Sequence, residues 1–165
     1  MLIYSVCKIL TYLYVQFDAT NSSSWIQFAQ FEAALADNTR ARAIFELGVQ
    51  QSSLSYPENL WKAYIDFEFE QGERALVRAV YERLTTLSGH WKAWVAFAEF
   101  EGSPIPMTQA EREEKYGEDD EEERFVDGDV EIARKTFERG YKDLKSKGLK
   151  QEVGFVWLLY IPYLT

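Results

Sequence analysis

The chain has 165 residues, of which 47% are apolar and 16% aromatic, so it is long enough for one domain with a sizeable core. Its formal net charge of −9 argues against direct binding to nucleic-acid phosphates, which requires a basic face. The single Cys and single His exclude an internal disulfide and a Cys/His metal cluster, and we predict no metal or cofactor.

The N-terminal segment, residues 1–17, is apolar. A secretory signal or membrane anchor is disfavoured because Lys8 interrupts the apolar run and no small-residue cleavage site follows it. The segment is also short for a membrane span. We therefore expect residues 1–23 to hold a partial preceding repeat, with a buried helix in residues 1–17, and an inter-repeat loop, and we expect no membrane association.

A pattern headed by Trp then occurs three times. Each Trp is followed by an aromatic residue at +3, another at +6 and a Glu at +7. The copies are Trp25, Phe28, Phe31 and Glu32; Trp61, Tyr64, Phe67 and Glu68; and Trp94, Phe97, Phe100 and Glu101. On an α-helix these four positions lie within a stripe about 120° wide, whereas a strand would put the first two on opposite faces. The pattern predicts one core-facing helix, called helix A, in each repeat.

A second pattern follows each copy and predicts a helix B. It consists of an Arg, an aromatic residue three positions later and then a Glu, with small residues beside the Arg in most copies. The copies are Arg42 with Phe45, Arg78 with Tyr81, and Arg134 with Phe137. The tryptophans are 36 and 33 residues apart, a spacing typical of helical-repeat arrays in which neighbouring units bury each other's apolar faces.

Turn and capping residues separate the predicted helices. Residues 37–39 end the first helix A, with Thr39 as the expected N-cap of helix B. Gly72 has the same place in the second repeat, and Pro57 suits the first turn of the second helix A. His90 is expected to be partly exposed at the start of the third helix A.

An insertion at residues 103–127 interrupts the third repeat and carries ten acidic and three basic residues. We expect a disordered or loosely helical loop, because the segment is like-charged and poor in branched apolar residues. A calcium site is disfavoured, since an EF-hand would need ligands where Phe125 and Arg134 stand. The insertion is either a solvated acidic loop or a docking strip for a basic partner.

A fourth helix A is expected to begin at Trp157, with Tyr160 at +3 and Tyr163 at +6. Leu164 replaces the signature Glu, and Pro162 falls inside the predicted helix, where proline is unfavourable. The predicted repeats are residues 24–56, 57–89 and 90–148, the last with the insertion, and 149–165 begin a further, incomplete repeat. The predicted fold class is all-α, an α-α superhelix built of helix pairs.

The signature Glu is expected to lie buried beside its Trp, where an unpaired carboxylate is costly. The Arg of helix B in the same repeat is its natural partner, although the pairing could equally cross to the neighbouring repeat. The expected own-repeat pairs are Glu32–Arg42, Glu68–Arg78 and Glu101–Arg134. A catalytic role for these carboxylates is disfavoured, since three copies at a repeat period indicate structure. For the same reason the aromatic residues are better explained as core than as base-stacking platforms.

The combined pattern resembles the HAT (half-a-TPR) repeat of RNA-processing proteins, a TPR-like solenoid. Residues 24–49 and 57–84 resemble the C-terminal half of the crooked neck family of pre-mRNA splicing factors. The resemblance implies a nuclear, non-enzymatic scaffold that contacts other spliceosome proteins of the Prp19-associated (NineTeen) complex. The alternatives are a HAT scaffold of another RNA-processing complex, such as mRNA 3′-end cleavage, or a nonfunctional or regulatory fragment. Self-association through uncapped solenoid ends is a further expectation.

Overall fold

The computed structural model is helical apart from one short β-ribbon, within the residues that it describes: 9, 13, 18–107, 109–116 and 125–163. The chain divides into two compact units, residues 1–67 and 68–165. The all-α fold class predicted from the repeats is confirmed, with predicted helices A and B found in order along the chain.

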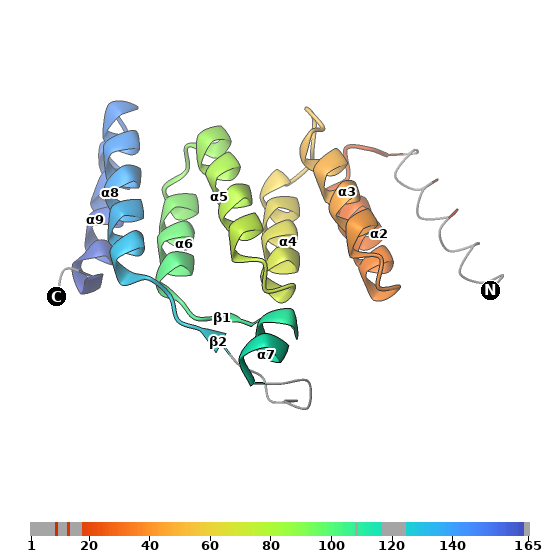
Figure 1. Cartoon of the computed structure of the whole chain (residues 1–165). Coiled ribbons are helices and arrows are strands. Elements are labelled where there is room, and N and C mark those ends of the chain that lie inside the picture. Colours follow the sequence, from red (N-terminus) through yellow and green to blue (C-terminus); the bar gives the residue numbers. More distant parts are fainter. Residues whose placement is uncertain (1–8, 10–12, 14–17, 108, 117–124, 164–165) are drawn as a thin grey trace. The chain divides into compact units, whose positions relative to one another are not determined.

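The first unit contains α2 (Ser22–Ala34), α3 (Asn38–Val49) and most of α4 (Pro57–Glu70). Helices α2 and α4 are predicted helices A, and α3 is a helix B that runs antiparallel to α2 (Figure 1). Pro57 begins α4 as predicted. The prediction that Thr39 caps α3 is wrong: Asp37 is the N-cap, because its carboxylate accepts a hydrogen bond from the Arg40 backbone N–H at 3.1 Å.

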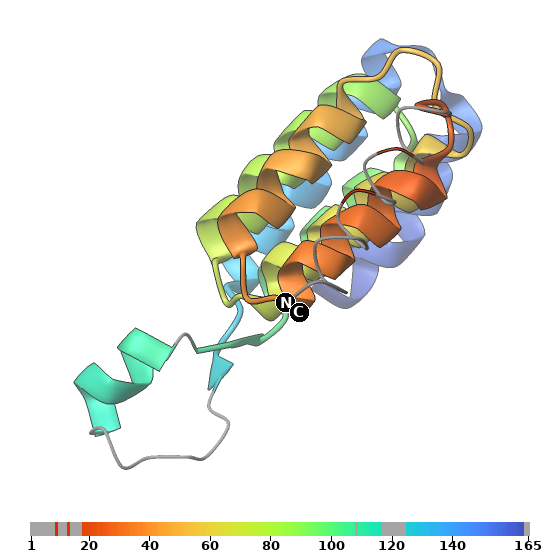
Figure 2. The ribbon, with the colours of Figure 1, turned by 90° about the vertical axis from the view of Figure 1, so that its right-hand side faces the viewer.

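The second unit contains α5 (Arg74–Ser88), α6 (Trp91–Gly102), α8 (Val130–Ser146), α9 (Lys150–Tyr160) and the 3₁₀ turn η1 (Ile161–Tyr163). Successive helices of this unit run in alternating directions (Figure 1). Helices α5 and α8 form one layer and α6 and α9 the other (Figure 2). Gly72 takes a positive φ of 73° at the turn before α5, as expected of a turn glycine.

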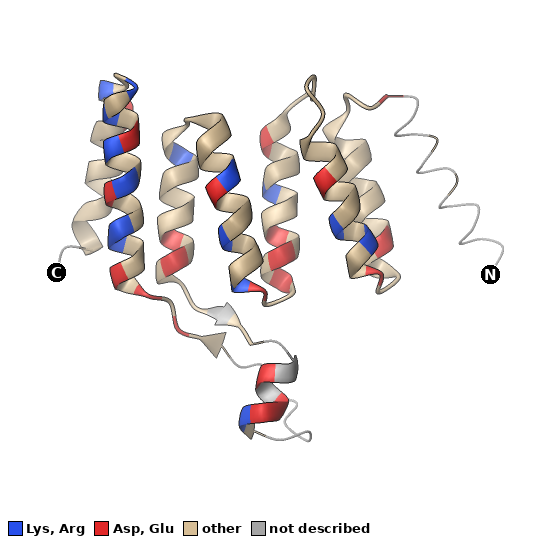
Figure 3. Ribbon diagram, turned by 45° about the horizontal axis from the view of Figure 1, so that its top comes forward, with Lys and Arg blue, Asp and Glu red and all other residues tan. Residues whose placement is uncertain are grey.

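In its described residues, the acidic insertion is more ordered than its composition predicts. It contains β1 (Ile105–Pro106), α7 (Gln109–Tyr116) and β2 (Phe125–Val126), and the two strands pair antiparallel. Figure 3 shows acidic residues along α7, and the insertion projects from the ends of α6 and α8 in Figure 2. Among the described residues, the expectation of a disordered or loosely helical loop is confirmed for the helical α7 and is wrong for the β-ribbon, and residues 108 and 117–124 of the insertion lie outside the described residues. The β-ribbon was not predicted, since two-residue strands leave no periodicity to read.

Two helix pairs, α2 with α3 and α6 with α8, pack a Trp of helix A against a Gly of helix B. A Cβ added at Gly48 would lie 3.1 Å from Trp25 Cγ, and one added at Gly140 would lie 2.8 Å from Trp94 Cγ. Both tryptophans are consequently buried, with 7% and 6% of their surface exposed. The close approach explains why a glycine, usually unfavourable inside a helix, stands at this position.

The fourth helix A differs from its prediction at both ends. It begins at Lys150, seven residues before Trp157, and its α-helical part ends at Tyr160. Pro162 lies in the 3₁₀ turn, so it does not interrupt an α-helix. Trp157 is 48% exposed, whereas Trp25, Trp61 and Trp94 are at most 7% exposed.

The predicted buried N-terminal helix falls almost entirely outside the described residues. Of residues 1–17 only Ile9 and Leu13 are described; both are helical and more than half exposed.

The Trp–Gly contact predicts opposite effects for two glycine substitutions. Gly140→Ala should lower the free energy of unfolding by about 1–3 kcal/mol, because the added methyl overlaps Trp94. Gly154→Ala in α9 is the control, since a Cβ there meets nothing within 4 Å. It should raise stability by about 0.5–1 kcal/mol through helix propensity. Urea unfolding curves measure both, and equal changes would contradict the contact.

Candidate protein-interaction site

The interfaces between repeats are organised around buried carboxylates. Glu32, Glu68 and Glu101 are each 0% exposed, although glutamate is seldom fully buried. Arg78 of α5 donates from Nε and Nη2 to the two oxygens of Glu101 at 2.6 and 2.7 Å, and Arg74 Nε lies 4.0 Å away. A bidentate pair of this kind offsets the cost of burying the carboxylate and fixes its orientation.

The direction of pairing differs from the own-repeat prediction. Glu101 pairs with Arg78 of the preceding helix B, so the predicted pairs Glu68–Arg78 and Glu101–Arg134 are wrong. Arg134 instead donates to the backbone carbonyl of Tyr163 in η1, which directly follows the next helix A. In both cases the Arg of helix B points toward the following repeat. The alternative prediction, in which the ion pair joins two neighbouring repeats, is therefore correct for α5 and α6.

The first repeat follows a related arrangement. Arg40 Nε lies 3.1 Å from Glu32, so the observed ion pair uses a residue two positions before the predicted Arg42. The Arg42 guanidinium lies over the Phe67 ring of α4 at 5.9 Å, again on the side of the following helix A.

Aromatic stacking repeats beside these ion pairs. The aromatic residue of helix B stacks on the +3 aromatic of the next helix A, with nearly parallel rings 5.1 Å apart for Phe45–Tyr64 and 5.2 Å for Tyr81–Phe97. The third pair, Phe137–Tyr160, is tilted by 40° at 5.5 Å. The +6 aromatics Phe67, Phe100 and Tyr163 complete these clusters. Phe31, the +6 residue of the first repeat, is half-buried.

Each helix B carries a Glu directly after its aromatic residue. The hydrogen-bond partner of this Glu differs with the +3 residue of the next helix A. Glu46 accepts from Tyr64 Oη at 2.7 Å and Glu138 from Tyr160 Oη at 3.3 Å. At the second interface the +3 residue is a Phe, and Glu82 instead binds Arg139 of α8 through both oxygens at 2.8 and 2.7 Å. The Arg139 hydrogen bonds hold the pKa of Glu82 below its usual range.

The insertion is anchored where α6 ends. Arg74 donates to the carbonyls of Phe100 and Glu101 in the last turn of α6 and of Ser103 just beyond it. The last carbonyls of a helix lack the N–H donors of a following turn. The backbones of Gly102 and Gly128 touch there, since a Cβ on Gly128 would lie 2.2 Å from the Gly102 carbonyl carbon. Both ends of the insertion are therefore held at one point.

The surface of α9 carries several exposed apolar side chains. Its exposed residues are Phe155, Trp157, Leu158 and Leu159, joined by Ile161 of η1. Exposed apolar patches, when they are large, are typical of protein-interaction sites. Within the described ranges, no group of three or more His, Cys, Asp or Glu is placed to hold a metal ion. No helix of the described part could cross a membrane.

The chain was compared with known proteins. No protein-family model matches it. It is 38% identical over 158 residues to pre-mRNA-splicing factor CLF1 of Pyricularia oryzae, covering 93% of this chain and 22% of the relative. It is 44% identical over 147 residues to pre-mRNA-splicing factor clf-1 of Neurospora crassa, covering 88% and 21%. Crooked neck-like protein 1 of Homo sapiens is 47% identical over 95 residues, covering 58% and 11%. The chain thus spans about a fifth of the length of the fungal relatives.

The buried ion pair predicts a specific loss of stability. Glu101→Gln should lower the free energy of unfolding by about 2–3 kcal/mol, because it leaves Arg78 and Arg74 without their carboxylate. Chemical denaturation measures the change, with the exposed neighbour Glu99→Gln as the control, expected within about 0.5 kcal/mol of the unmodified chain. Equal free energies of unfolding for the two variants would contradict a structural role for the Glu101–Arg78 pair.

Proposed function

We propose that this chain, a homologue of a segment of the crooked neck and CLF1 pre-mRNA-splicing factors, is a non-enzymatic scaffold for protein–protein contacts in spliceosome assembly. The identity of 38–44% over 88–93% of the chain to two splicing factors carries the proposal. A location in the nucleus and contact with proteins of the Prp19-associated complex form part of it. The burial of the repeated carboxylates supports a structural and not a catalytic role for them.

We propose that the signature residues build the repeats and leave partner binding to outward surfaces. The proposed repeats are residues 24–56, 57–89 and 90–148, followed by the helix A that begins the segment 149–165. In support, all three signature tryptophans are at most 7% exposed. The net charge of −9 supports protein partners rather than direct contact with nucleic-acid phosphates.

Affinity capture tests the scaffold function. The tagged chain, incubated in nuclear extract, should enrich spliceosome proteins relative to a bait carrying Glu101→Gln and Gly140→Ala together, whose fold is weakened. Mass spectrometry identifies the captured proteins. Recovery of mRNA 3′-end cleavage factors would redirect the function to that complex, and capture of nothing specific would favour a nonfunctional fragment.

Self-association through the apolar face of α9 is a second part of the proposal. Phe155 and Leu158 are 50% and 64% exposed on this face, and their burial would favour a dimer. Leu158→Glu should therefore reduce the mass measured by light scattering at high concentration. Leu87→Glu, at a 69% exposed leucine of α5, should leave it unchanged. A monodisperse monomer at every concentration would contradict self-association.

A further inference from the structure

Lysine side chains gather at one end of the second unit. The C-terminal end of α8 lies beside the start of α6, since a Cβ added at Gly89 would be 3.5 Å from Lys147 Nζ. The same end of α8 leads directly into α9, and Figure 3 shows Lys and Arg residues gathered there. We define the lysine cluster as five exposed residues: Lys92, Lys142, Lys145, Lys147 and Lys150. Residues 88–93 and 142–152, which contain the cluster, hold two acidic residues, so this end is positive in a chain whose net charge is −9.

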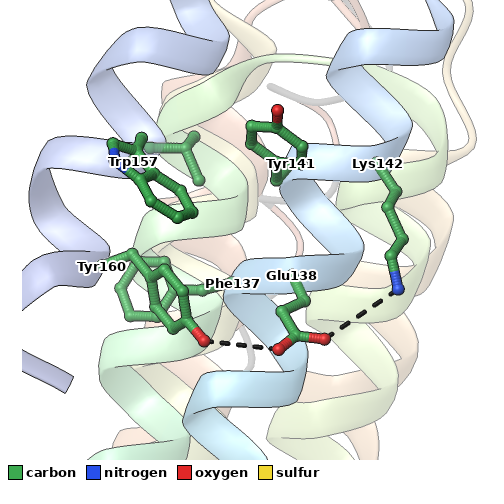
Figure 4. A pocket seen from close by; sticks show the side chains of 7 residues that line it. Phe137, Glu138, Tyr141, Lys142, Trp157 and Tyr160 are labelled. Carbon is green, nitrogen blue, oxygen red and sulfur yellow. Dashed lines mark hydrogen bonds and ion pairs between the residues drawn. The ribbon is translucent and has the colours of Figure 1, made fainter. Parts of the chain in front are cut away.

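The charges of the lysine cluster are only partly compensated. Two of the five lysines pair with a carboxylate one turn earlier on α8, as Lys142 does with Glu138 in Figure 4. The other three have no carboxylate partner within the described residues: Lys92, Lys145 and Lys150. Lys92 and Lys150 also stand in the first turns of α6 and α9, where the helix dipole disfavours a cation. An external anionic group would relieve both unfavourable placements.

An aromatic pair lies at the surface beside the lysine cluster. The Trp91 ring of α6 stacks on the Phe155 ring of α9 at 5.1 Å, and Lys92 Nζ lies 5.7 Å from the Trp91 centroid. Phe155 is 50% exposed. Its position, two residues before the signature Trp, holds Ser23 in α2 and Lys92 in α6. Both of these residues are exposed although further helices follow α2 and α6, so the packing of repeats leaves this position at the surface.

The acidic insertion has the complementary chemistry and lies at the other end of α8. It joins the end of α6 to the start of α8, and α8 has 17 residues, a length of about 25 Å. Its ten acidic and three basic residues give the insertion a net charge of −7. Two aromatic side chains of the insertion are exposed, Tyr116 by 45% and Phe125 by 50%. Carboxylates beside exposed aromatic rings match a surface that has lysines beside an aromatic pair.

We propose that the lysine cluster and the Trp91–Phe155 pair bind the acidic insertion of a second copy of this chain. The insertion of the same copy is anchored at the far end of α8, where the backbones of Gly102 and Gly128 touch. Because the two surfaces lie at opposite ends of α8, two antiparallel copies bring each lysine cluster to the insertion of the other. A twofold axis closes this arrangement, so assembly stops at a dimer. Parallel copies would instead place like charges together.

This contact goes beyond the proposed scaffold function and uses a surface different from the apolar face of α9. Phe155 borders both surfaces, but Lys92 belongs to the lysine cluster and Leu158 to the apolar face. The contact proposed here depends on opposite charges, whereas burial of Leu158 depends on apolar area. The two kinds of self-association therefore respond differently to salt and to substitution.

Charge reversal in the lysine cluster tests the contact in the full chain. Light scattering at high concentration should give twice the monomer mass of 19.2 kDa. Lys92→Glu should raise the dimer dissociation constant about tenfold, because it sets a carboxylate against the acidic insertion. It should leave α6 folded, since an acidic residue suits the first turn of a helix. The control Lys62→Glu makes the same change of net charge at an exposed lysine of α4 and should leave the dissociation constant unchanged.

A mixture of two charge-reversed chains tests the antiparallel arrangement. One chain has the three lysines without a carboxylate partner replaced by Glu, and the other has three exposed glutamates of α7 replaced by Lys. Each should be monomeric alone. Mixed in equal amounts they should form a dimer, because both of its contacts then join opposite charges. Recovery of the dimer excludes unfolding as the cause of dissociation, and a mixture that stays monomeric would overturn the arrangement. The substitutions are Lys92→Glu, Lys145→Glu and Lys150→Glu in one chain and Glu111→Lys, Glu113→Lys and Glu114→Lys in the other.

The remaining outcomes separate this contact from other occupants of the surface. A dimer that Leu158→Glu dissociates and Lys92→Glu does not would place self-association on the apolar face of α9 and overturn the present inference alone. High salt should weaken the dimer, and a dimer that salt strengthens would overturn the inference as well. A chain that is monomeric at every concentration, yet binds a single-stranded RNA of about ten nucleotides until Lys92→Glu is introduced, would assign the lysine cluster to nucleic acid. None of these results depends on which proteins are captured from nuclear extract.

Discussion

The carboxylate of Glu101, buried on α6, requires a cation, and the cation comes from α5, the helix B before it. Because Arg78 supplies this charge to Glu101, α5 and α6 are held in a fixed register, and the Tyr81–Phe97 stack is set beside the ion pair. The free energy of such a pair is gained only when two successive repeats are in place. This dependence on neighbours is the general property of helical-repeat proteins, in which interfaces contribute as much as the units themselves.

The periodicity was enough to predict the helices and the burial of three glutamates, since both follow from positions on one helical face. It could not predict which arginine each glutamate meets. A helix B lies between two helices A, and spacing along the chain does not say toward which of them Arg78 or Arg134 points. Gly48 and Gly140 were missed because a glycine inside a helix has no periodic signal; their common position, six residues after Arg42 and Arg134, would have revealed them.

The repeats share the same packing of aromatic residues and differ in the polar contacts beside it. Where the +3 residue is Tyr64 or Tyr160, the glutamate of helix B accepts a hydrogen bond from the phenol. Where it is Phe97, the glutamate binds an arginine from a third helix. The observed partner of this glutamate therefore differs between the interfaces.

The contact of Gly102 with Gly128 makes the packing of α6 and α8 independent of the acidic insertion between them. Both ends of the insertion meet at the end of α6, where Arg74 also binds the terminal carbonyls. The distance from α6 to α8 therefore does not depend on how many residues the insertion contains. Since loop-closure entropy changes only slowly with length, evolution can lengthen, shorten or recharge this segment at small thermodynamic cost. The third repeat is thus a tolerant position for acquiring new sequence without disturbing its neighbours.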